Sequence, residues 1–202
     1  MSEQSKAEYS PKEIAIFEGV LQLVSEGNRL EELKVADIAL KAGVGKGTVY
    51  EYFDCKEEII AKAVKYHLDV AVARVEQVIV RSRDCRTMLF ELLDIAAGVF
   101  GEKLILLLTE SGAVLGEKSG KLLSQQICDS KKVCGERVRD EIIARLEDFK
   151  PGQLVPDKEY FGFVFGGVMC SYVQSVSCEA EGSAAFAKSK EYAYNMLMKA
   201  LS

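Results

Sequence analysis

The chain has 202 residues and a net charge of −5, and 28% of its residues are charged while 49% are hydrophobic. This balance is typical of a globular protein, and it argues against a protein that coats nucleic acid through phosphate attraction alone. No charged-then-apolar leader opens the chain, so we expect a cytoplasmic protein whose six cysteines are reduced.

The first predicted element is a helix that begins at Ser10-Pro11-Lys12-Glu13. Serine is a favoured N-cap, proline suits the first helical position, and the glutamate completes a capping box. Apolar residues then recur at helical spacing at Phe17, Val20, Leu21 and Val24. We expect this helix to pack across the elements that follow it.

The segment from Val35 to Tyr52 predicts two short helices joined by a turn. Gly43 ends the first helix, because glycine tolerates the positive φ of a helix C-terminus. In the second helix, Val44 and Val49 are expected to face a core, which leaves Lys46, Thr48 and Tyr50 pointing outward. A helix of two turns with a donor-rich outer face fits the major groove of DNA.

This segment resembles the DNA-binding region of the TetR (tetracycline-repressor) family of bacterial regulators. The resemblance covers about Ser10 to Ile60 and rests on Asp37-Ile38-Ala39, Ala42-Gly43-Val44, Lys46-Gly47-Thr48, Tyr50, Tyr52-Phe53 and Lys56. It implies an all-α protein with an N-terminal three-helix helix-turn-helix unit at residues 1–56. A larger helical domain for effector binding and dimerisation would occupy residues 57–202.

Three positions depart from the family pattern. Lys34 stands where the family usually has a capping Thr or Ser, Gly45 replaces a Ser, and Glu51 replaces a basic or polar residue. Between Lys34 and Lys56 there are four lysines and three acidic residues, a net charge of only +1. We therefore expect few ion pairs with phosphates and a larger share of anchoring by backbone amides and tyrosine hydroxyls. The expected DNA contacts are Lys34, Val35, Gly45, Lys46, Gly47, Thr48, Tyr50, Tyr52 and Lys56.

A long helix is predicted next, because Asp54-Cys55-Lys56-Glu57 repeats the capping-box pattern and an apolar stripe continues to about Val80. It would connect the DNA-reading unit to the second domain. Helical periodicity continues after Asp84, and further helices are predicted at Ser119 to Phe149, Asp157 to about Ser177, and Ser183 to Leu201. The uncharged run from Phe161 to Cys178 is diluted by glycine and serine, which favours a buried helix over a membrane span.

The last two helices are expected to form a homodimer interface, because glycines and large apolar residues share a face. The alternative is that both stripes serve only the core of the single chain. The expected interface residues are Phe161, Gly162, Phe165, Gly166, Met169, Ala185, Phe186, Ala193 and Leu197.

The second domain is expected to bind a small, mostly apolar effector. The expected pocket walls are His67, Phe90, Phe100, Leu104, Leu107, Phe163 and Tyr172. A lone histidine such as His67 is more often simply hydrogen-bonded or exposed. Glu91 and Asp94 would suit a cationic effector, but a solvated polar face is the better interpretation.

The resulting hypothesis is a regulator, by resemblance most often a repressor, that binds a palindromic operator in double-stranded DNA as a homodimer. No enzyme activity, metal or cofactor is expected, because His67 is the only histidine and no C-x-x-C pair occurs. Two alternatives remain open. One is a helical interaction protein that has lost operator binding, and the other is a thiol-based redox sensor that uses Cys55 at a helix N-terminus.

Overall fold

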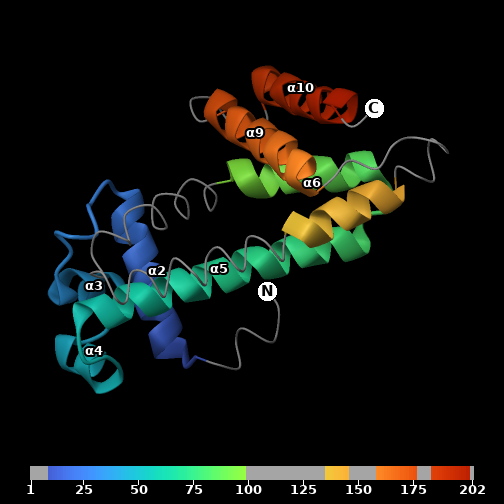
Figure 1. The fold of residues 1–202 in the computed structure, drawn as a ribbon. Coiled ribbons are helices and arrows are strands. Elements are labelled where there is room, and N and C mark those ends of the chain that lie inside the picture. Colours follow the sequence, from blue (N-terminus) through green and yellow to red (C-terminus); the bar gives the residue numbers. More distant parts are fainter. Residues whose placement is uncertain (1–8, 99–134, 146–157, 177–182, 201–202) are drawn as a thin grey trace. The chain divides into compact units, whose positions relative to one another are not determined.

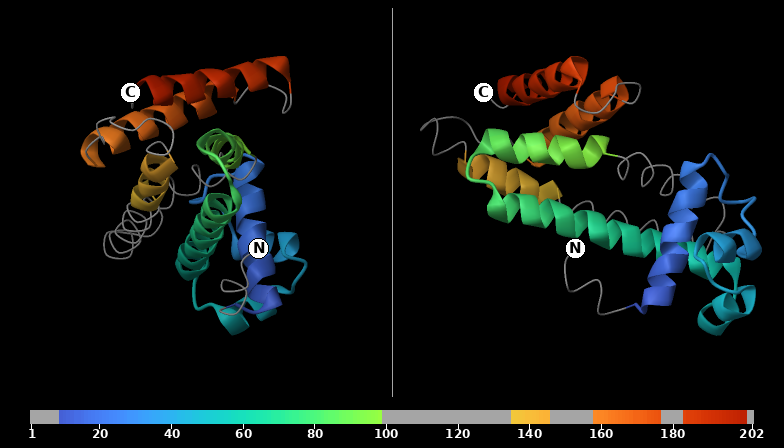
Figure 2. Two further views of the ribbon diagram at one scale, coloured as in Figure 1. Left: turned by 90° about the vertical axis from the view of Figure 1, so that its right-hand side faces the viewer. Right: turned by 180° about the vertical axis from the view of Figure 1, so that it is seen from behind.

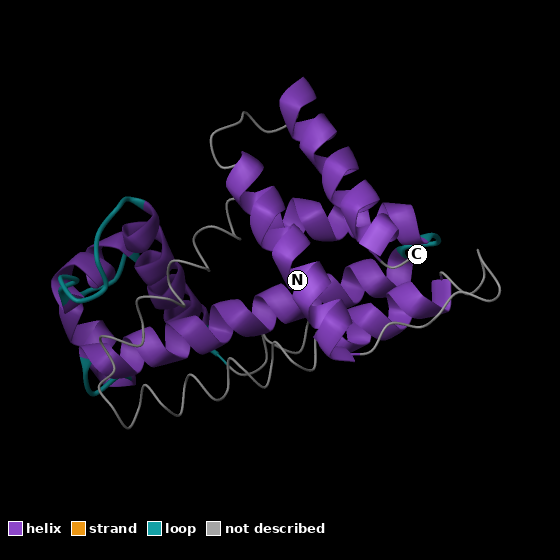
Figure 3. Ribbon diagram, turned by 45° about the horizontal axis from the view of Figure 1, so that its top comes forward, coloured by secondary structure: helices purple, strands orange, loops and turns teal. Residues whose placement is uncertain are grey.

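The structure is a computed structural model that describes residues 9–98, 135–145, 158–176 and 183–200. The described part is helical, with turns and loops between helices, and it contains no strand (Figure 3). This confirms the all-α prediction. The labelled helices in Figure 1 are α2 (Pro11–Ser25), α3 (Val35–Lys41), α4 (Lys46–Tyr52), α5 (Lys56–Arg81), α6 (Cys85–Ala97), α9 (Lys158–Val176) and α10 (Ala184–Ala200).

Residues 135–145 form a further helix. They are the described part of the helix predicted over Ser119 to Phe149, and the rest of that prediction lies outside the described residues. No helix in the described ranges is long and apolar enough to cross a membrane.

The described residues fall into two compact units that divide inside α5, between Arg74 and Val75. The first unit contains α2, α3, α4 and the beginning of α5. The second contains the end of α5, α6, the 135–145 helix, α9 and α10. The predicted boundary at residue 56 divides the expected DNA-binding residues from the rest of the chain, whereas the compact units divide after Arg74. The functional boundary stays a prediction.

The hydrogen bonds at the starts of α2 and α5 follow the capping boxes that the sequence predicts, with one difference at α5. At α2 the Ser10 amide donates to Glu13 Oε2 at 2.8 Å and the Glu13 amide donates to Ser10 Oγ at 3.3 Å, so the predicted capping box is present. At the start of α5 the Asp54 amide donates to a carboxylate at 2.8 Å, but this carboxylate belongs to Glu58. The expectation that Glu57 has this role was wrong by one residue.

The core of the first unit is built around Phe17 of α2. Its ring centroid lies 5.8 Å from that of Phe53 and 5.5 Å from that of Tyr66, and all three side chains are almost fully buried. Aromatic rings at these separations add attraction beyond the area that they bury. Phe17 therefore joins α2 to the residue that follows α4 and to the middle of α5.

Helices α2 and α3 approach each other closely at Gly19. A Cβ atom at this position would lie 3.2 Å from the carbonyl oxygen of Ile38 and 3.3 Å from the amide nitrogen of Ala42. Backbone atoms cannot yield as the end of a flexible side chain can, so a larger residue would push α3 away. The absence of a side chain at Gly19 thus sets how α3 sits on α2.

The second unit has its own apolar core, in which α9 and α10 lie side by side in every view (Figure 2). Val78 and Ile79 enter this core from α5, and Val138 and Ile142 enter it from the 135–145 helix. Phe161, Phe186, Ala193 and Leu197 are also buried in it, with exposed fractions of 2%, 9%, 5% and 2%. These four residues are among those expected at the dimer interface; their side chains are buried within the single chain, and the interface itself stays a prediction.

A buried histidine connects α5 to α2 in the first unit. His67 has no exposed surface, and its Nε2 lies 3.1 Å from the carbonyl oxygen of Phe17. Burial lowers the pKa of His67 below its ordinary value of 6.5, because an imidazolium is poorly solvated there, although the Phe17 carbonyl and Glu18 oppose the shift. The neutral ring then donates Nε2–H to Phe17. His67 is thus a hydrogen-bonded core residue, which is the alternative to its expected role as a pocket wall.

This lowered pKa predicts an acid-sensitive core. Above about pH 6.5 the folded and unfolded chains both carry neutral His67, and its contribution to stability is fully present. As the pH falls from 6.5 toward the lower folded pKa, the unfolded chain gains a proton first, so stability is lost. In His67→Gln, which keeps an N–H donor, the free energy of unfolding from urea titrations at pH 7.5 and pH 5.5 should differ less than in the wild type. Equal pH dependence in the two proteins would contradict the assignment.

Candidate functional site

Helices α3 and α4 form a helix-turn-helix whose turn is fixed by backbone hydrogen bonds. The Val44 amide donates to the Ala39 carbonyl at 3.0 Å and the Gly43 amide donates to the Leu40 carbonyl at 3.2 Å, the pair that defines a Schellman motif. Gly43 has φ +66°, a conformation in which a Cβ is strained. The turn therefore needs glycine at this position, as the sequence predicted.

One side of α4 is held in the core and the opposite side is open. Val49 has no exposed surface, whereas Lys46, Gly47 and Tyr50 are exposed. Lys46 Nζ lies 5.9 Å from the centroid of the Tyr50 ring, so the charge and the aromatic face share one patch. We call Lys46, Gly47 and Tyr50 the α4 outer face. Thr48 and Tyr52 are half-buried at its margins.

The start of α3 departs from an ordinary capped helix. Lys34 occupies the N-cap position with extended backbone, and its side chain makes no capping hydrogen bond. The Lys34 side chain is exposed, while that of Val35 is 8% exposed and packs inward. A DNA contact from Val35 would therefore use its backbone. Gly45, the N-cap of α4, likewise supplies no side-chain cap.

Two of the four lysines in this region are engaged within the chain. Lys41 Nζ lies 2.6 Å from Glu26 Oε1, and Lys56 Nζ donates to the Glu31 carbonyl oxygen at 2.8 Å. Lys56 thereby holds the loop that precedes α3 against the start of α5. In the described part of the chain, only Lys34 and Lys46 of these four have no such partner, so the positive footprint is smaller than the count of lysines suggests. Cys55 is exposed beside this surface, and its redox role stays a prediction.

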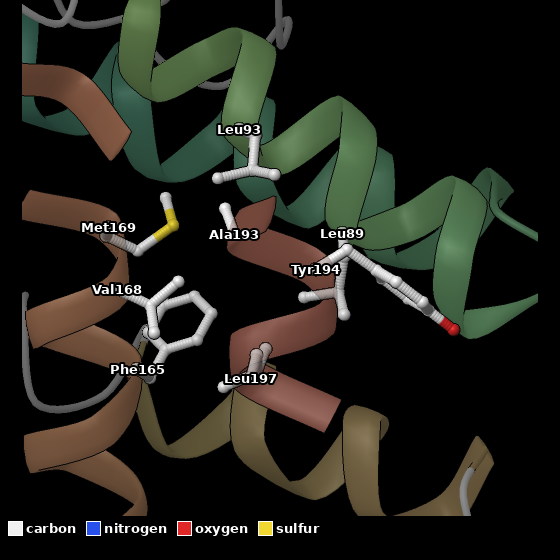
Figure 4. Close-up of a pocket in the computed structure, with 8 residues that line it drawn as sticks. All are labelled: Leu89, Leu93, Phe165, Val168, Met169, Ala193, Tyr194 and Leu197. Atoms are coloured by element: carbon white, nitrogen blue, oxygen red, sulfur yellow. The ribbon is translucent and has the colours of Figure 1, made fainter. Parts of the chain in front are cut away.

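The second unit contains a small apolar hollow between α6, α9 and α10 (Figure 4). Its cavity volume is about 10 Å³, which is room for roughly one water molecule and far below the several hundred Å³ of small-molecule sites. Its lining is wholly apolar apart from one phenol: Leu89, Leu93, Phe165, Val168, Met169, Ala193, Tyr194 and Leu197.

Of the seven expected pocket residues, the four that the structure describes do not line this hollow. His67 belongs to the core of the first unit, Phe163 is 84% exposed, and Tyr172 is buried against Phe186. Phe90 comes nearest, because its ring centroid lies 5.9 Å from that of the lining residue Tyr194. Phe100, Leu104 and Leu107 lie outside the described residues. The apolar periodicity of the sequence predicted these helices, but it does not show which of their faces pack together.

The two acidic residues of α6 are paired within the chain. Glu91 accepts from Arg81 at 2.8 Å, and Asp94 pairs with Lys190 of α10. The Lys190 side chain is only 15% exposed, so this second pair is partly shielded from water. Neither carboxylate is left over for a cationic effector, although both belong to a polar side of α6 as expected.

The outer sides of α9 and α10 carry large exposed apolar residues. Phe163 is 84% exposed, Tyr192 57%, Met196 55% and Tyr160 46%. Of the expected interface residues, Gly162 and Ala185 are exposed and Phe165, Gly166 and Met169 are half-buried. Exposed large apolar side chains, where they gather on one surface, are typical of an interaction site.

Residues 30–63 match the family model described as bacterial regulatory proteins of the tetR family. The fatty acid metabolism regulator protein of Bacillus subtilis (strain 168) is 33% identical over 67 residues. This match covers 33% of the chain and 34% of that relative, so the chain matches about a third of the relative's length.

Two solved structures share the fold over most of their length. The fatty acid degradation regulator FadR from Bacillus halodurans has a TM-score of 0.67 and 18% identity, covering 94% of this chain and 96% of that one. A transcriptional regulator from Saccharomonospora viridis in complex with choline has a TM-score of 0.69 and 14% identity, covering 92% of this chain and 95% of that one. At such identities the likeness concerns the fold.

The uncapped start of α3 generates a stability prediction. In Lys34→Thr, the new hydroxyl should accept from an amide in the first turn of α3 and stabilise the fold by about 1 kcal/mol. Lys34→Ala is the matched control, since it removes the same charge without adding a cap. Urea denaturation should rank Lys34→Thr above both the wild type and Lys34→Ala, and equal stability of the two variants would contradict the capping argument.

Proposed function

We propose that the chain is a transcriptional regulator of the TetR family, whose family model residues 30–63 match, and that it binds a palindromic operator as a homodimer. A small, mostly apolar effector releases it from the DNA, so it acts as a repressor. The observation that carries the proposal is the α4 outer face. A reading helix needs exposed donors on one side and a fixed anchor on the other, and α4 combines Lys46 and Tyr50 with the fully buried Val49.

The remaining expected DNA contacts are assigned from their positions. Lys46, Tyr50 and Tyr52 hold phosphates, Thr48 reaches a base edge or a thymine methyl, and Gly47 lets the backbone approach the duplex. Lys34 adds a phosphate contact from the start of α3, where Val35 and Gly45 offer backbone amides. Lys56 contributes less than expected, because its ammonium already binds the Glu31 carbonyl.

Dimerisation uses the outer sides of α9 and α10. One helix of seven residues reads only a few base pairs, so a symmetric partner has to supply a second reading head. The exposed side chains Phe163, Tyr192 and Met196 offer the apolar area, and Gly162 and Gly166 allow the partner's backbone to come close. The partner-facing surface is therefore centred on Phe163 rather than on Phe161.

The effector is proposed to carry an apolar, fatty-acyl-like chain. The hollow lined by Leu89, Phe165 and Leu197 has no charged group, and one end of such a chain would enter there by parting α6, α9 and α10. Two relatives are named for fatty acid regulation, whereas the neighbour with choline concerns a cation. Asp94 is engaged with Lys190, which favours the acyl chain over a cation here. Because α5 runs continuously from the first unit into the second, it is the element through which effector binding would reach the reading heads.

The DNA-binding assignment predicts the behaviour of two lysine variants. After selection of bound sites from random DNA, Lys46→Ala should weaken binding roughly tenfold and reduce the slope of log affinity against log salt by about one unit per subunit. Lys34→Thr should also bind more weakly, even though its fold is more stable. Fluorescence anisotropy across a salt series measures both quantities.

Arg83→Ala is the matched control, because it removes one exposed positive charge from the loop before α6, outside the helix-turn-helix. It should retain the wild-type affinity and slope. Unchanged binding by Lys46→Ala would show that the reading helix is misplaced. If no DNA site is recovered at all, the chain is a helical interaction protein instead. Release of the bound DNA by decanoate, and not by choline, is the outcome expected from the effector proposal.

The dimer assignment predicts that Phe163→Glu yields monomers. Placing a charge in an apolar contact should weaken association roughly thirtyfold or more, and operator binding should weaken with it. Val80→Glu is the control, since Val80 is 76% exposed on α5 and undergoes the same change of chemistry. Sedimentation velocity would show the change, and a dimeric Phe163→Glu protein would refute the proposed surface.

A further inference from the structure

Arg139 is the one charged side chain that is buried in the part of the chain the structure describes, with an exposed fraction of 9%. Its Nε and Nη2 atoms both donate to Oδ1 of Asp140, the Nε bond being 2.9 Å long. The Asp140 side chain is 63% exposed, so this partner lies largely in water. The third nitrogen, Nη1, is buried and has no acceptor.

Two other arginines attach the helix that carries Arg139 to α5. The same helix carries Arg137, which pairs with Glu76 of α5 at 2.9 Å, and Arg145, which donates to the Ile79 carbonyl of α5 at 2.9 Å. These two arginines fix the helix to α5 from one side. Arg139 lies instead next to Val138 and one turn before Ile142, both of which face the apolar core.

The same core contains a second buried donor. The Tyr172 hydroxyl is buried without a hydrogen-bond partner, and burial raises the pKa of Tyr172 to about 12, so the hydroxyl keeps its proton at neutral pH. A buried donor without an acceptor costs stability, and a buried charge without a full set of partners costs more. One ligand oxygen would satisfy either group, and an anion matches the charge of the guanidinium.

We propose that Arg139 binds the anionic head of the effector, a carboxylate or a phosphate, through Nη1, while the apolar part of the same molecule occupies the core. This inference rests on the proposed apolar effector and adds a second requirement to it: one negative charge at the end of the chain. Guanidinium groups suit this task because they are permanently charged and present several donors in a fixed plane.

The experiment compares decanoate with decan-1-ol, both below their aggregation limits, by isothermal titration with the full-length protein. The two molecules share a ten-carbon chain and differ in the charge of the head group. The wild type should bind decanoate about tenfold or more tightly than the alcohol, as expected for a charge-assisted hydrogen bond in a buried site. Decyl phosphate in place of decanoate distinguishes the two anionic heads.

Arg139→Met keeps the apolar stem and removes the charge, so its affinities for decanoate and decan-1-ol should become equal. Asp140→Asn is the matched control: it neutralises the exposed partner, leaves Arg139 intact and should keep the preference for decanoate. Arg139→Lys, which retains the charge without the planar fork, should show a reduced preference, and it serves as a second test if Arg139→Met fails to fold by circular dichroism.

The outcomes separate this inference from the proposed function. If the wild type binds both molecules equally, the apolar effector stands and the role of Arg139 is overturned. If neither molecule binds, the effector class itself is wrong and the inference falls with it, while operator binding is unaffected. If Arg139→Met loses dimerisation but keeps the preference for decanoate, the partner of Arg139 is a second copy of the chain and the inference is overturned.

Discussion

A helix of seven residues is too short to be stable by itself in water, so α4 depends on the core behind it. Val49 is fully buried, and Phe53, directly after the helix, packs against Phe17 of α2. The close approach at Gly19 and the turn at Gly43 then fix where α3 lies. The short helix α4 is thereby held by its contact with α3 and, through Phe53, by α2, so the residues on its outer side are not needed for packing.

The lysines of this region are likewise divided between those that stabilise the fold and those that are left exposed. Lys41 and Lys56 reach across to Glu26 and to the Glu31 carbonyl, and in doing so they stabilise the loop that leads into α3. The Lys41 ion pair and the Lys56 hydrogen bond to a carbonyl each contribute little stability, but they position the loop and engage two lysines that would otherwise be available to DNA phosphates. With a net charge of −5 and so few unpaired lysines, the chain is expected to gain little affinity for DNA from phosphate attraction, so contacts to base edges and backbone amides matter more.

Local chemistry made the first half of this fold predictable. The Ser10 cap, the glycine turn and the apolar spacing of α3 and α4 are each decided within a few residues, and the structure has them where the sequence indicates. The sides of α9 were not predictable, because Phe161, Phe163 and Phe165 are alike in the sequence and only tertiary packing buries the first and exposes the second. The partners of Lys56 and Asp94 are 25 and 96 residues away, a separation that periodicity cannot report.

Both units bury polar groups within their apolar cores. In the first, His67 is neutral and its Nε2 bonds the Phe17 carbonyl. In the second, the Ser82 hydroxyl, Arg139 Nη1 and the Tyr172 hydroxyl are buried without acceptors. Removing such donors would stabilise a purely structural core, so their presence indicates a core shaped by something other than stability. The proposed effector site accounts for one of these groups, because an anionic ligand would give Arg139 Nη1 the acceptor that the described part of the chain does not provide.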